Sequence, residues 1–201
     1  MASVLIRTVD NYNNQKSSKI REFIKINFLS SPLKETVEGG EKTLDLGCGW
    51  GFYFKINPSA VGIEIDGDCV NYLKSRGRNI VCGDIAGTLP FKDNAFRWVV
   101  AHDVLEHFEI EDAKKIISEV LRILEPGGKF MILSPNKKGY LSGLKRSVGH
   151  KHFITFKEIS DISYGNFVIE KHFYHPLPES VSEFFTHNKE ITVLKKPEGI
   201  T

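Results

Sequence analysis

Three glycines stand on alternate positions after a short apolar run, at Gly47, Gly49 and Gly51. Glycine has no Cβ, so it adopts positive φ at little cost and lets a ligand approach the main chain. The apolar run, residues 43–46, is expected to end a buried strand, and ligands of open α/β sheets bind beyond the carboxyl ends of strands. The spacing predicts a backbone cradle for a small cofactor, and the alternative is an ordinary strand-to-helix turn.

The positions of the glycines separate two kinds of glycine-rich loop. In a dinucleotide fingerprint the third glycine comes three positions after the second, but Phe52 stands there in this chain. Asp45, two positions before the first glycine, completes the pattern acid-x-G-x-G-x-G. This pattern resembles the first motif of the class I S-adenosylmethionine-dependent methyltransferases.

Two more carboxylates end or follow predicted strands. Glu64 ends the run Val61–Glu64, 19 positions after Asp45, where an acid can accept hydrogen bonds from both hydroxyls of a ribose. The alternative for Glu64 is an exposed loop carboxylate. Asp84 follows the strand predicted at 79–82, where a carboxylate can accept a hydrogen bond from the exocyclic amine of adenine. The acids therefore predict contacts to an amino acid, a ribose and a base.

Further segments extend the resemblance over about residues 40–135. They are similar, in order and in spacing, to motifs of the small-molecule "type 11" methyltransferase family. The segments are Gly83-Asp84, Leu89-Pro90-Phe91, Asp93-Asn94-Ala95-Phe96, Val104-Leu105-Glu106-His107 and 121–128. The resemblance implies an enzyme that transfers methyl groups, with S-adenosylmethionine as cofactor and S-adenosylhomocysteine as product.

The resemblance also implies the residues of the methionine end of the cofactor site. Asp45 would orient the amino group of the methionine moiety, directly or through water. The backbone of Gly47, Cys48 and Gly49 would line that moiety. His102, which ends the fourth predicted strand, would contribute its backbone and its side chain beside the methionine.

At the other end of the cofactor, the same resemblance assigns four residues. Glu64 would hold the ribose, and Ile65 would lie beside the adenine. Asp84 and the amide of Ile85 would bind the edge of the adenine. These assignments agree with those made from the positions of the acids alone.

The sequence proposes two histidines as general bases, His107 and His152. Methyl transfer from a sulfonium needs mainly that the acceptor is held in line, so positioning supplies much of the rate enhancement. A base helps only an acceptor that arrives protonated, and histidine, with a pKa of about 6.5, is suited to that role. For His107 the alternative is a contact to the backbone or a helix cap. The three cysteines lack metal-ligand spacing, so no metal site is expected.

A basic stretch late in the chain indicates the charge of the acceptor. From Pro126 to Lys157 there are seven Lys and Arg residues and no acid, which favours an anionic acceptor or, alternatively, a solvated surface. Residues 149–159 are similar to a stretch that walls the acceptor pocket in small-molecule and lipid-precursor methyltransferases, and Thr155 with Glu158 predicts a capping box. We expect a small-molecule or lipid-like acceptor carrying phosphate or carboxylate.

Nucleic acid is the less favoured partner, because the basic stretch lacks the interleaved aromatic residues of a base-stacking surface. The alternative function is a non-catalytic S-adenosylmethionine-binding or RNA-interaction module on the same fold. The composition, 41% hydrophobic and 26% charged, is that of a soluble globular protein. No apolar run approaches the ~20 residues that cross a bilayer, and no secretory signal is recognisable, so we expect a cytoplasmic protein.

Alternating apolar runs and helical patterns predict an α/β fold, and the resemblance implies its topology. We expect a Rossmann-like, mostly parallel sheet of seven strands in the order 3-2-1-4-5-7-6, the last strand antiparallel, with helices on both faces. One methyltransferase domain would span 1–201, with an N-terminal segment and helix over 1–35, a cofactor-binding core over 40–135 and acceptor-side loops, helices and strands over 136–201. The predicted strands are 43–47, 60–65, 79–82, 96–102, 128–134, 167–173 and 191–194.

Helices are predicted where apolar residues recur with helical spacing. The pattern at 111–124 is the most regular, with an apolar stripe that should face the sheet. Pro126-Gly127-Gly128 should end that helix before the next strand begins. The other predicted helices are 16–29, 51–56, 67–75, 156–162 and 179–185.

Overall fold

The computed structural model describes residues 30–135, 154–175 and 189–199. The helices predicted at 16–29 and 179–185 lie outside these ranges. Within them, no helix is long and apolar enough to cross a membrane.

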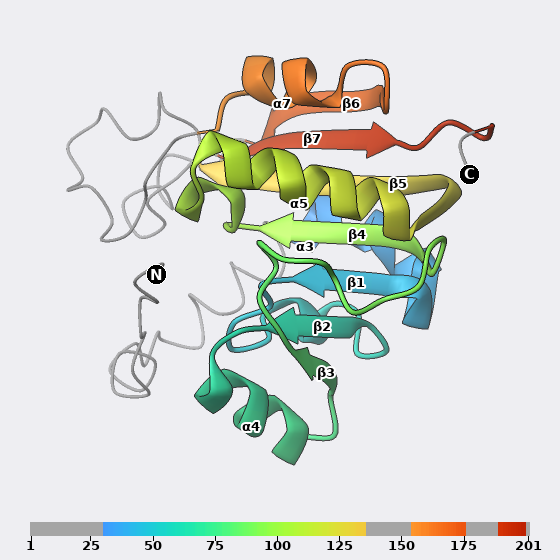
Figure 1. Cartoon of the computed structure of the whole chain (residues 1–201). Coiled ribbons are helices and arrows are strands. Elements are labelled where there is room, and N and C mark those ends of the chain that lie inside the picture. Colours follow the sequence, from blue (N-terminus) through green and yellow to red (C-terminus); the bar gives the residue numbers. More distant parts are fainter. Residues whose placement is uncertain (1–29, 136–153, 176–188, 200–201) are drawn as a thin grey trace, which may run out of the picture.

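The centre of the molecule is a seven-stranded sheet in the order β3-β2-β1-β4-β5-β7-β6 (Figure 1). Strands β1 to β5 pair in parallel, whereas β7 is antiparallel to both β5 and β6. The strands are β1 (Thr43–Leu46), β2 (Val61–Glu64), β3 (Asn79–Cys82), β4 (Phe96–His102), β5 (Leu124–Pro135), β6 (Val168–His175) and β7 (Lys189–Lys195). The predicted sheet order and strand directions are confirmed.

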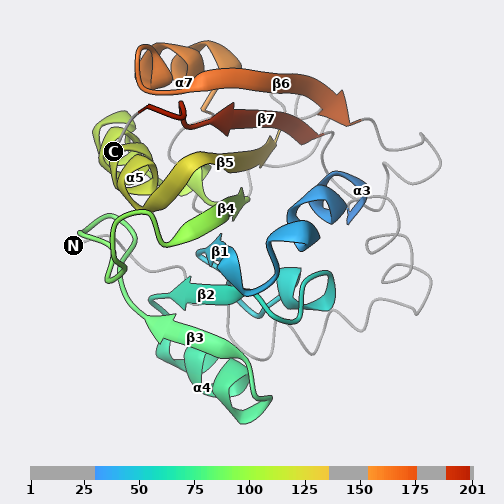
Figure 2. The same ribbon diagram turned by 90° about the vertical axis from the view of Figure 1, so that its right-hand side faces the viewer.

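Helices cover both faces of this sheet (Figure 2). On one face lie α5 (Ile110–Ile123) and α7 (Phe156–Ser163). On the other lie α3 (Ser30–Leu33), the 3-10 segment η2 (Lys34–Lys42) and α4 (Gly67–Ser75). The stripe of α5 is buried as predicted, by Ala113, Ile116, Ile117, Val120 and Ile123. Each fully buried Ile or Val of this kind contributes about 1.5–3 kcal/mol, so α5 is anchored by its apolar face.

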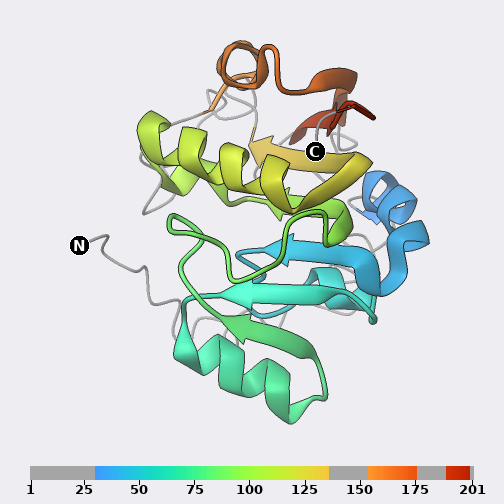
Figure 3. The same ribbon diagram turned by 45° about the vertical axis from the view of Figure 1, so that its right-hand side comes forward.

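The connection from β3 to β4 contains no helix, although every residue of 83–95 is described. In Figures 1 and 3 this segment, called here the β3–β4 loop, passes over β1 and β2 on the face that α5 also covers. Ile85 and Leu89 are buried in the same apolar cluster as the α5 stripe. The β3–β4 loop therefore covers part of the sheet that a crossover helix would otherwise cover.

Three predicted boundaries are wrong. The chain enters β5 at Leu124, directly after α5, because that residue already pairs with Phe96; Pro126-Gly127-Gly128 lies inside the strand. The predicted helix at 51–56 is only a 3-10 turn, η3 (Tyr53–Lys55), since Asn57 and Pro58 follow it closely. The helix predicted over 16–29 was expected to end before Ser30, but residues Ser30–Leu33 are helical and form α3. Pro32 occupies an early position of α3, where no N–H is needed.

Candidate functional site

The glycine loop, residues 47–51, follows β1 at the carboxyl edge of the parallel strands, and its three glycines have positive φ values of 61°, 51° and 81°. A Cβ atom on Gly51 would lie 2.5 Å from Leu73 Cδ2, and one on Gly47 3.2 Å from Val104 Cγ2. A Cβ on Gly49 would meet no heavy atom of the protein within 4 Å. Two of the glycines are therefore needed for packing, and Gly49 faces open space.

Backbone hydrogen bonds fix the shape of this loop. The Cys48 N–H donates to the Ile63 carbonyl of β2 at 3.2 Å, and the Gly51 N–H donates to the Cys48 carbonyl at 2.9 Å. The Cys48 side chain is buried, which raises the pKa of its thiol. A Cβ on Gly62 would lie 2.9 Å from the Cys48 sulfur, so a glycine in β2 makes room for this side chain. Cys48 can offer a ligand only its backbone.

Glu64 connects the end of β2 to the glycine loop. Its Oε2 accepts from the Gly49 N–H at 2.8 Å, and its Oε1 accepts from the amides of Ile65 at 2.8 Å and Asp66 at 3.0 Å. A carboxylate can accept about four hydrogen bonds, so these three leave capacity for a donor from a ligand. The predicted ribose acid therefore also holds the glycine loop in place.

Asp45 is only 3% exposed although it is ionisable. Burial raises the pKa of its carboxyl well above the ordinary value, and the neighbouring charge of Glu64 raises it further. Among the residues that the structure describes, none donates a hydrogen bond to this carboxylate. A buried acid without such a donor is destabilising by itself, which is typical of a group placed for a ligand rather than for stability.

The residues predicted for adenine lie at the ends of β2 and β3. Ile65 is 47% exposed. Asp84 is exposed, and its Oδ1 accepts from the Ala86 N–H at 2.9 Å. Ile85 is buried, and its Cδ1 would lie 3.9 Å from a Cβ on Gly47. The two strand ends therefore lie next to the glycine loop.

The end of β4 completes this edge. The His102 ring packs on Phe52 with a centroid distance of 5.4 Å, and His102 Nε2 lies 3.5 Å from Asp103 Oδ2. Asp103 has a φ of +55°, which costs energy for any residue with a side chain, and its N–H donates to the Leu133 carbonyl at 3.0 Å. Phe52 and Asp103 were not predicted as site residues.

A signal for both missed residues was present. Phe52 was considered only as the residue that replaces a fingerprint glycine, and Asp103 is a carboxylate directly after a predicted strand. What the sequence did not contain is the turn that brings them together, because the positive φ of Asp103 follows from the contact with β5.

Of the two proposed bases, the structure describes one. His107 ends the 3-10 turn η4 (Leu105–His107), is partly exposed, and donates its backbone N–H to the Val104 carbonyl at 3.1 Å. His152 lies outside the described residues. The N-cap position of helix α5 is occupied by Glu109 and not by His107.

The described part of the basic stretch is paired with acids. Lys129 Nζ lies 2.8 Å from Glu170 Oε2, and Lys157 Nζ lies 2.7 Å from Asp161 Oδ2. The remaining Lys and Arg residues of the stretch lie outside the described ranges. The capping box of α7 is confirmed, because Thr155 and Glu158 bond each other's backbone amides.

Comparison with known proteins identifies the part of the chain that carries this site. Residues 44–132 match a family described as "Methyltransferase domain". Over these residues the chain is similar to methyltransferase domains. A solved Pyrococcus horikoshii structure is similar, with a TM-score of 0.68, 22% identity and coverage of 90% of this chain and 92% of that one.

Two curated relatives carry names that mention tRNA. "Probable tRNA methyltransferase 9B" of Mus musculus is 34% identical over 97 residues, 46% of this chain and 21% of that protein. "tRNA (carboxymethyluridine(34)-5-O)-methyltransferase" of Arabidopsis thaliana is 32% identical over 101 residues, 49% of this chain and 25% of that protein. The chain therefore spans a quarter or less of the length of these relatives, and the likeness covers about half of the chain's own residues.

The described residues fit the cofactor of this domain. S-Adenosylmethionine carries an ammonium group, two ribose hydroxyls and an adenine. For these three groups the edge offers the buried acid Asp45, the strand-end carboxylate of Glu64, and the exposed side chains of Ile65 and Asp84. The open space at Gly49 lies between these groups in the chain and gives a ligand access to the backbone. In the described part of the chain, no cluster of His, Cys, Asp or Glu suits a metal ion.

Proposed function

We propose that this chain transfers a methyl group from S-adenosylmethionine to a small-molecule or lipid-like acceptor that carries an anionic group. The observation that supports the donor is Gly49, a residue with positive φ and no protein atom within 4 Å of its Cβ position. It follows Asp45, and its N–H bonds Glu64. Backbone access between two strand-end acids is the arrangement that an amino-acid and ribose ligand needs.

The side chains of the site have separate tasks in this proposal. Asp45 would bind the cofactor's ammonium group, whose positive charge favours the ionised carboxylate that burial disfavours in the free protein. Glu64 would accept from the ribose hydroxyls, and Ile65 would cover one side of the adenine. Bound S-adenosylmethionine supplies an electrophilic methyl group, and the protein holds the acceptor in line with it.

At the methyl end, His102 and Phe52 would pack beside the methionine portion, because their rings lie in contact at the end of β4. Asp103, next to them, would place a negative charge near the sulfonium. His107 is kept as a proposed general base for an acceptor that arrives protonated. His152 is kept as the second.

The donor assignment is tested by calorimetry with S-adenosylhomocysteine. Gly49→Arg fills the open space, so this variant should no longer bind S-adenosylhomocysteine. Gly165→Arg is the matched control and should still bind it. Gly165 also has positive φ, +80°, and no neighbour within 4 Å of its Cβ position, but it lies in the turn before β6. Undiminished binding in Gly49→Arg would remove the cofactor assignment.

RNA is the second candidate acceptor, and the names of the two tRNA-methyltransferase relatives favour it. The family match, however, ends at residue 132, so the likeness concerns the cofactor half of the chain and not the half expected to bind the acceptor. Fold and cofactor do not determine the substrate. The small-molecule proposal therefore keeps its support from the 149–159 segment and the basic stretch.

A transfer assay with labelled S-adenosylmethionine separates the two acceptors. Label should enter a small-molecule or lipid extract and not total tRNA. Charge reversal at Lys145 and Arg146, which lie outside the described residues, should raise the Michaelis constant of the acceptor at least about tenfold. Label in tRNA alone would replace the proposed acceptor with RNA and leave the donor assignment intact.

A further inference from the structure

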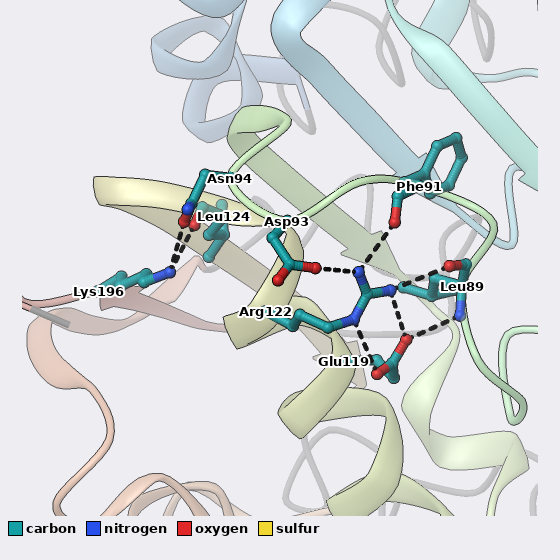
Figure 4. A network of polar contacts seen from close by, with 8 residues as sticks. All are labelled: Leu89, Phe91, Asp93, Asn94, Glu119, Arg122, Leu124 and Lys196. Atoms are coloured by element: carbon teal, nitrogen blue, oxygen red, sulfur yellow. Dashed lines mark hydrogen bonds and ion pairs between the residues drawn. The ribbon is translucent and has the colours of Figure 1, made fainter. Parts of the chain in front are cut away.

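The β3–β4 loop is held from outside by two charged side chains of α5, Arg122 and Glu119 (Figure 4). Arg122 donates to the carbonyls of Leu89 at 3.0 Å and Phe91 at 2.9 Å, and to Asp93 Oδ1 at 2.7 Å. Glu119 accepts from the Leu89 N–H at 2.8 Å and pairs with Arg122 at 2.8 Å. We call this arrangement the Arg122 clamp.

The clamp binds both backbone polar groups of Leu89, so this residue can neither rotate nor shift without losing a hydrogen bond. The Leu89 side chain is 1% exposed and lies in the same apolar cluster as Ile85. Ile85 in turn reaches to 3.9 Å from the Cβ position of Gly47. Arg122 therefore holds Leu89, which shares an apolar cluster with Ile85, and Ile85 lies close to the glycine loop.

Between Leu89 and β3 the chain makes one tight turn that begins with Asp84. The Asp84 carboxylate accepts from the Ala86 N–H at 2.9 Å, and its carbonyl accepts from the Gly87 N–H at 3.4 Å. The turn closes at Gly87, two residues before Leu89, so the clamp holds the chain close to Asp84. The Asp84 side chain is exposed.

We propose that Arg122, together with Glu119, is a positioning residue for adenine recognition: by fixing Leu89 it orients Asp84 and Ile85 toward the adenine edge. This inference rests on the proposed function. Arg122 lies on the far side of the loop from the glycine loop and would touch neither the cofactor nor the acceptor.

The electrostatics of the clamp agree with this role. The hydrogen bond from Arg122 lowers the pKa of Glu119, and the bonds to Glu119 and Asp93 raise the pKa of Arg122. Both groups therefore stay charged wherever the protein is folded near neutral pH. The planar guanidinium reaches several acceptors at fixed angles, which a lysine cannot reproduce, so Arg122→Lys keeps the charge and loses the geometry.

A buried cation at the other end of the loop provides a matched control. Lys196 is 2% exposed and donates to Asn94 Oδ1 at 2.9 Å and to the Leu124 carbonyl at 2.8 Å (Figure 4). It holds the last part of the loop against the end of β7 and makes none of the contacts to Leu89. Lys196→Met should affect stability without affecting the recognition of adenine.

The test measures discrimination between S-adenosylhomocysteine and S-inosylhomocysteine, which lacks the exocyclic amine. In the wild type the ratio of the two dissociation constants should favour the adenine form, because Asp84 loses its donor in the analogue. In Arg122→Lys, and in Glu119→Gln, the ratio should fall by about tenfold, whereas Lys196→Met should leave it unchanged. A general loss of stability would not move this ratio.

A double-variant cycle with Asp84→Ala completes the test. If Arg122 acts through Asp84, the ratio in Arg122→Lys with Asp84→Ala should equal that of Asp84→Ala alone. The inference alone would be overturned if the wild type discriminates between the two ligands and the ratio of dissociation constants is unchanged in both clamp variants. It would also be overturned if Arg122→Lys and Asp84→Ala change this ratio independently in the cycle. Failure of the wild type to bind S-adenosylhomocysteine would overturn the proposed function and this inference with it.

Discussion

The glycine loop lies at the carboxyl edge of the parallel strands, whereas the β3–β4 loop starts at that edge and crosses over β1 and β2 (Figures 1 and 3), and the two loops are held by different means. The glycine loop is shaped from within, by positive-φ glycines and by Glu64, which lies 15 residues from Gly49 in the chain. The β3–β4 loop is shaped from outside, by an arginine 33 residues away from Leu89. One loop therefore follows local rules, and the other depends on tertiary contacts.

The difference explains which residues the sequence could predict. The acid-x-G-x-G-x-G spacing states its own backbone requirement, so the positive φ values of the glycines could be predicted. The contacts of Asp45 and Glu64 to a cofactor stay predictions. Arg122 stands in a segment that the sequence resemblance covered, yet its role depends on the approach of Leu89 to α5. No spacing rule connects two residues that meet only after the sheet has formed.

The largest effect is expected for Gly51→Ala. The added Cβ would lie 2.5 Å from Leu73 and would hold a φ of +81°, so the free energy of unfolding should fall by about 3 kcal/mol. Urea denaturation measures it. Gly49→Ala, which adds strain without a clash, should cost about 1 kcal/mol. Equal losses would mean that the glycine loop is not shaped by packing on α4.

The next effect is expected for Arg122→Ala, which leaves the Phe91 carbonyl without its side-chain donor and the Leu89 carbonyl with only the Phe91 N–H. The free energy of unfolding should fall by about 2 kcal/mol, and the amides of 86–91 should exchange with solvent faster than those of 47–51. Hydrogen exchange measures the local effect. Uniformly faster exchange in both loops would mean that they are one unit.

Glu64→Gln should have a smaller effect, because the amide keeps one of the two acceptor oxygens. Of the bonds to Gly49, Ile65 and Asp66, at least one is lost, so the free energy of unfolding should fall by about 1 kcal/mol. Faster exchange of the Gly49 amide would locate the loss in the glycine loop. Faster exchange confined to the β3–β4 loop would contradict the separation of the two loops.

The smallest effect is expected for Asp45→Asn, and it has the opposite sign. Burial, and then the charge of Glu64, raise the pKa of Asp45 in the folded state, so at high pH the folded protein bears an ionised buried acid. Removing that charge should raise the free energy of unfolding by about 0.5 kcal/mol at pH 8, measured without cofactor. Binding of S-adenosylhomocysteine should weaken at the same time.

The pH dependence of that difference follows from the direction of the shift. The unfolded chain has an aspartate pKa near 3.9, so between that pH and the raised folded-state pKa only the folded protein holds the proton. Wild-type stability should therefore rise as the pH falls through the folded-state pKa, and the advantage of Asp45→Asn should disappear. An advantage that persists at low pH would show that the ionised form is not the cause.

The fold was predictable where apolar patterns are long or strands are buried on both faces. The stripe of α5 follows from such a pattern, and the capping box follows from the spacing of Thr155 and Glu158. The order of the strands was implied by the family resemblance. The boundary at Pro126 was not predictable, because the pairing of Leu124 with Phe96 extends β5 through residues that usually end elements. In the site, Phe52 and Asp103 were not predicted, because the contact of Phe52 with His102 and the hydrogen bond from Asp103 to Leu133 form only in the folded chain.

The clamp on the β3–β4 loop has a consequence for protein engineering. Most of its contacts to the loop end on main-chain atoms, the N–H and carbonyl of Leu89 and the carbonyl of Phe91. Main-chain atoms are the same in every residue, so the anchoring does not depend on which side chains the loop carries. The exposed positions Gly87 and Thr88 are therefore open to exchange, and new surface chemistry can be introduced close to Asp84 while the loop keeps its path.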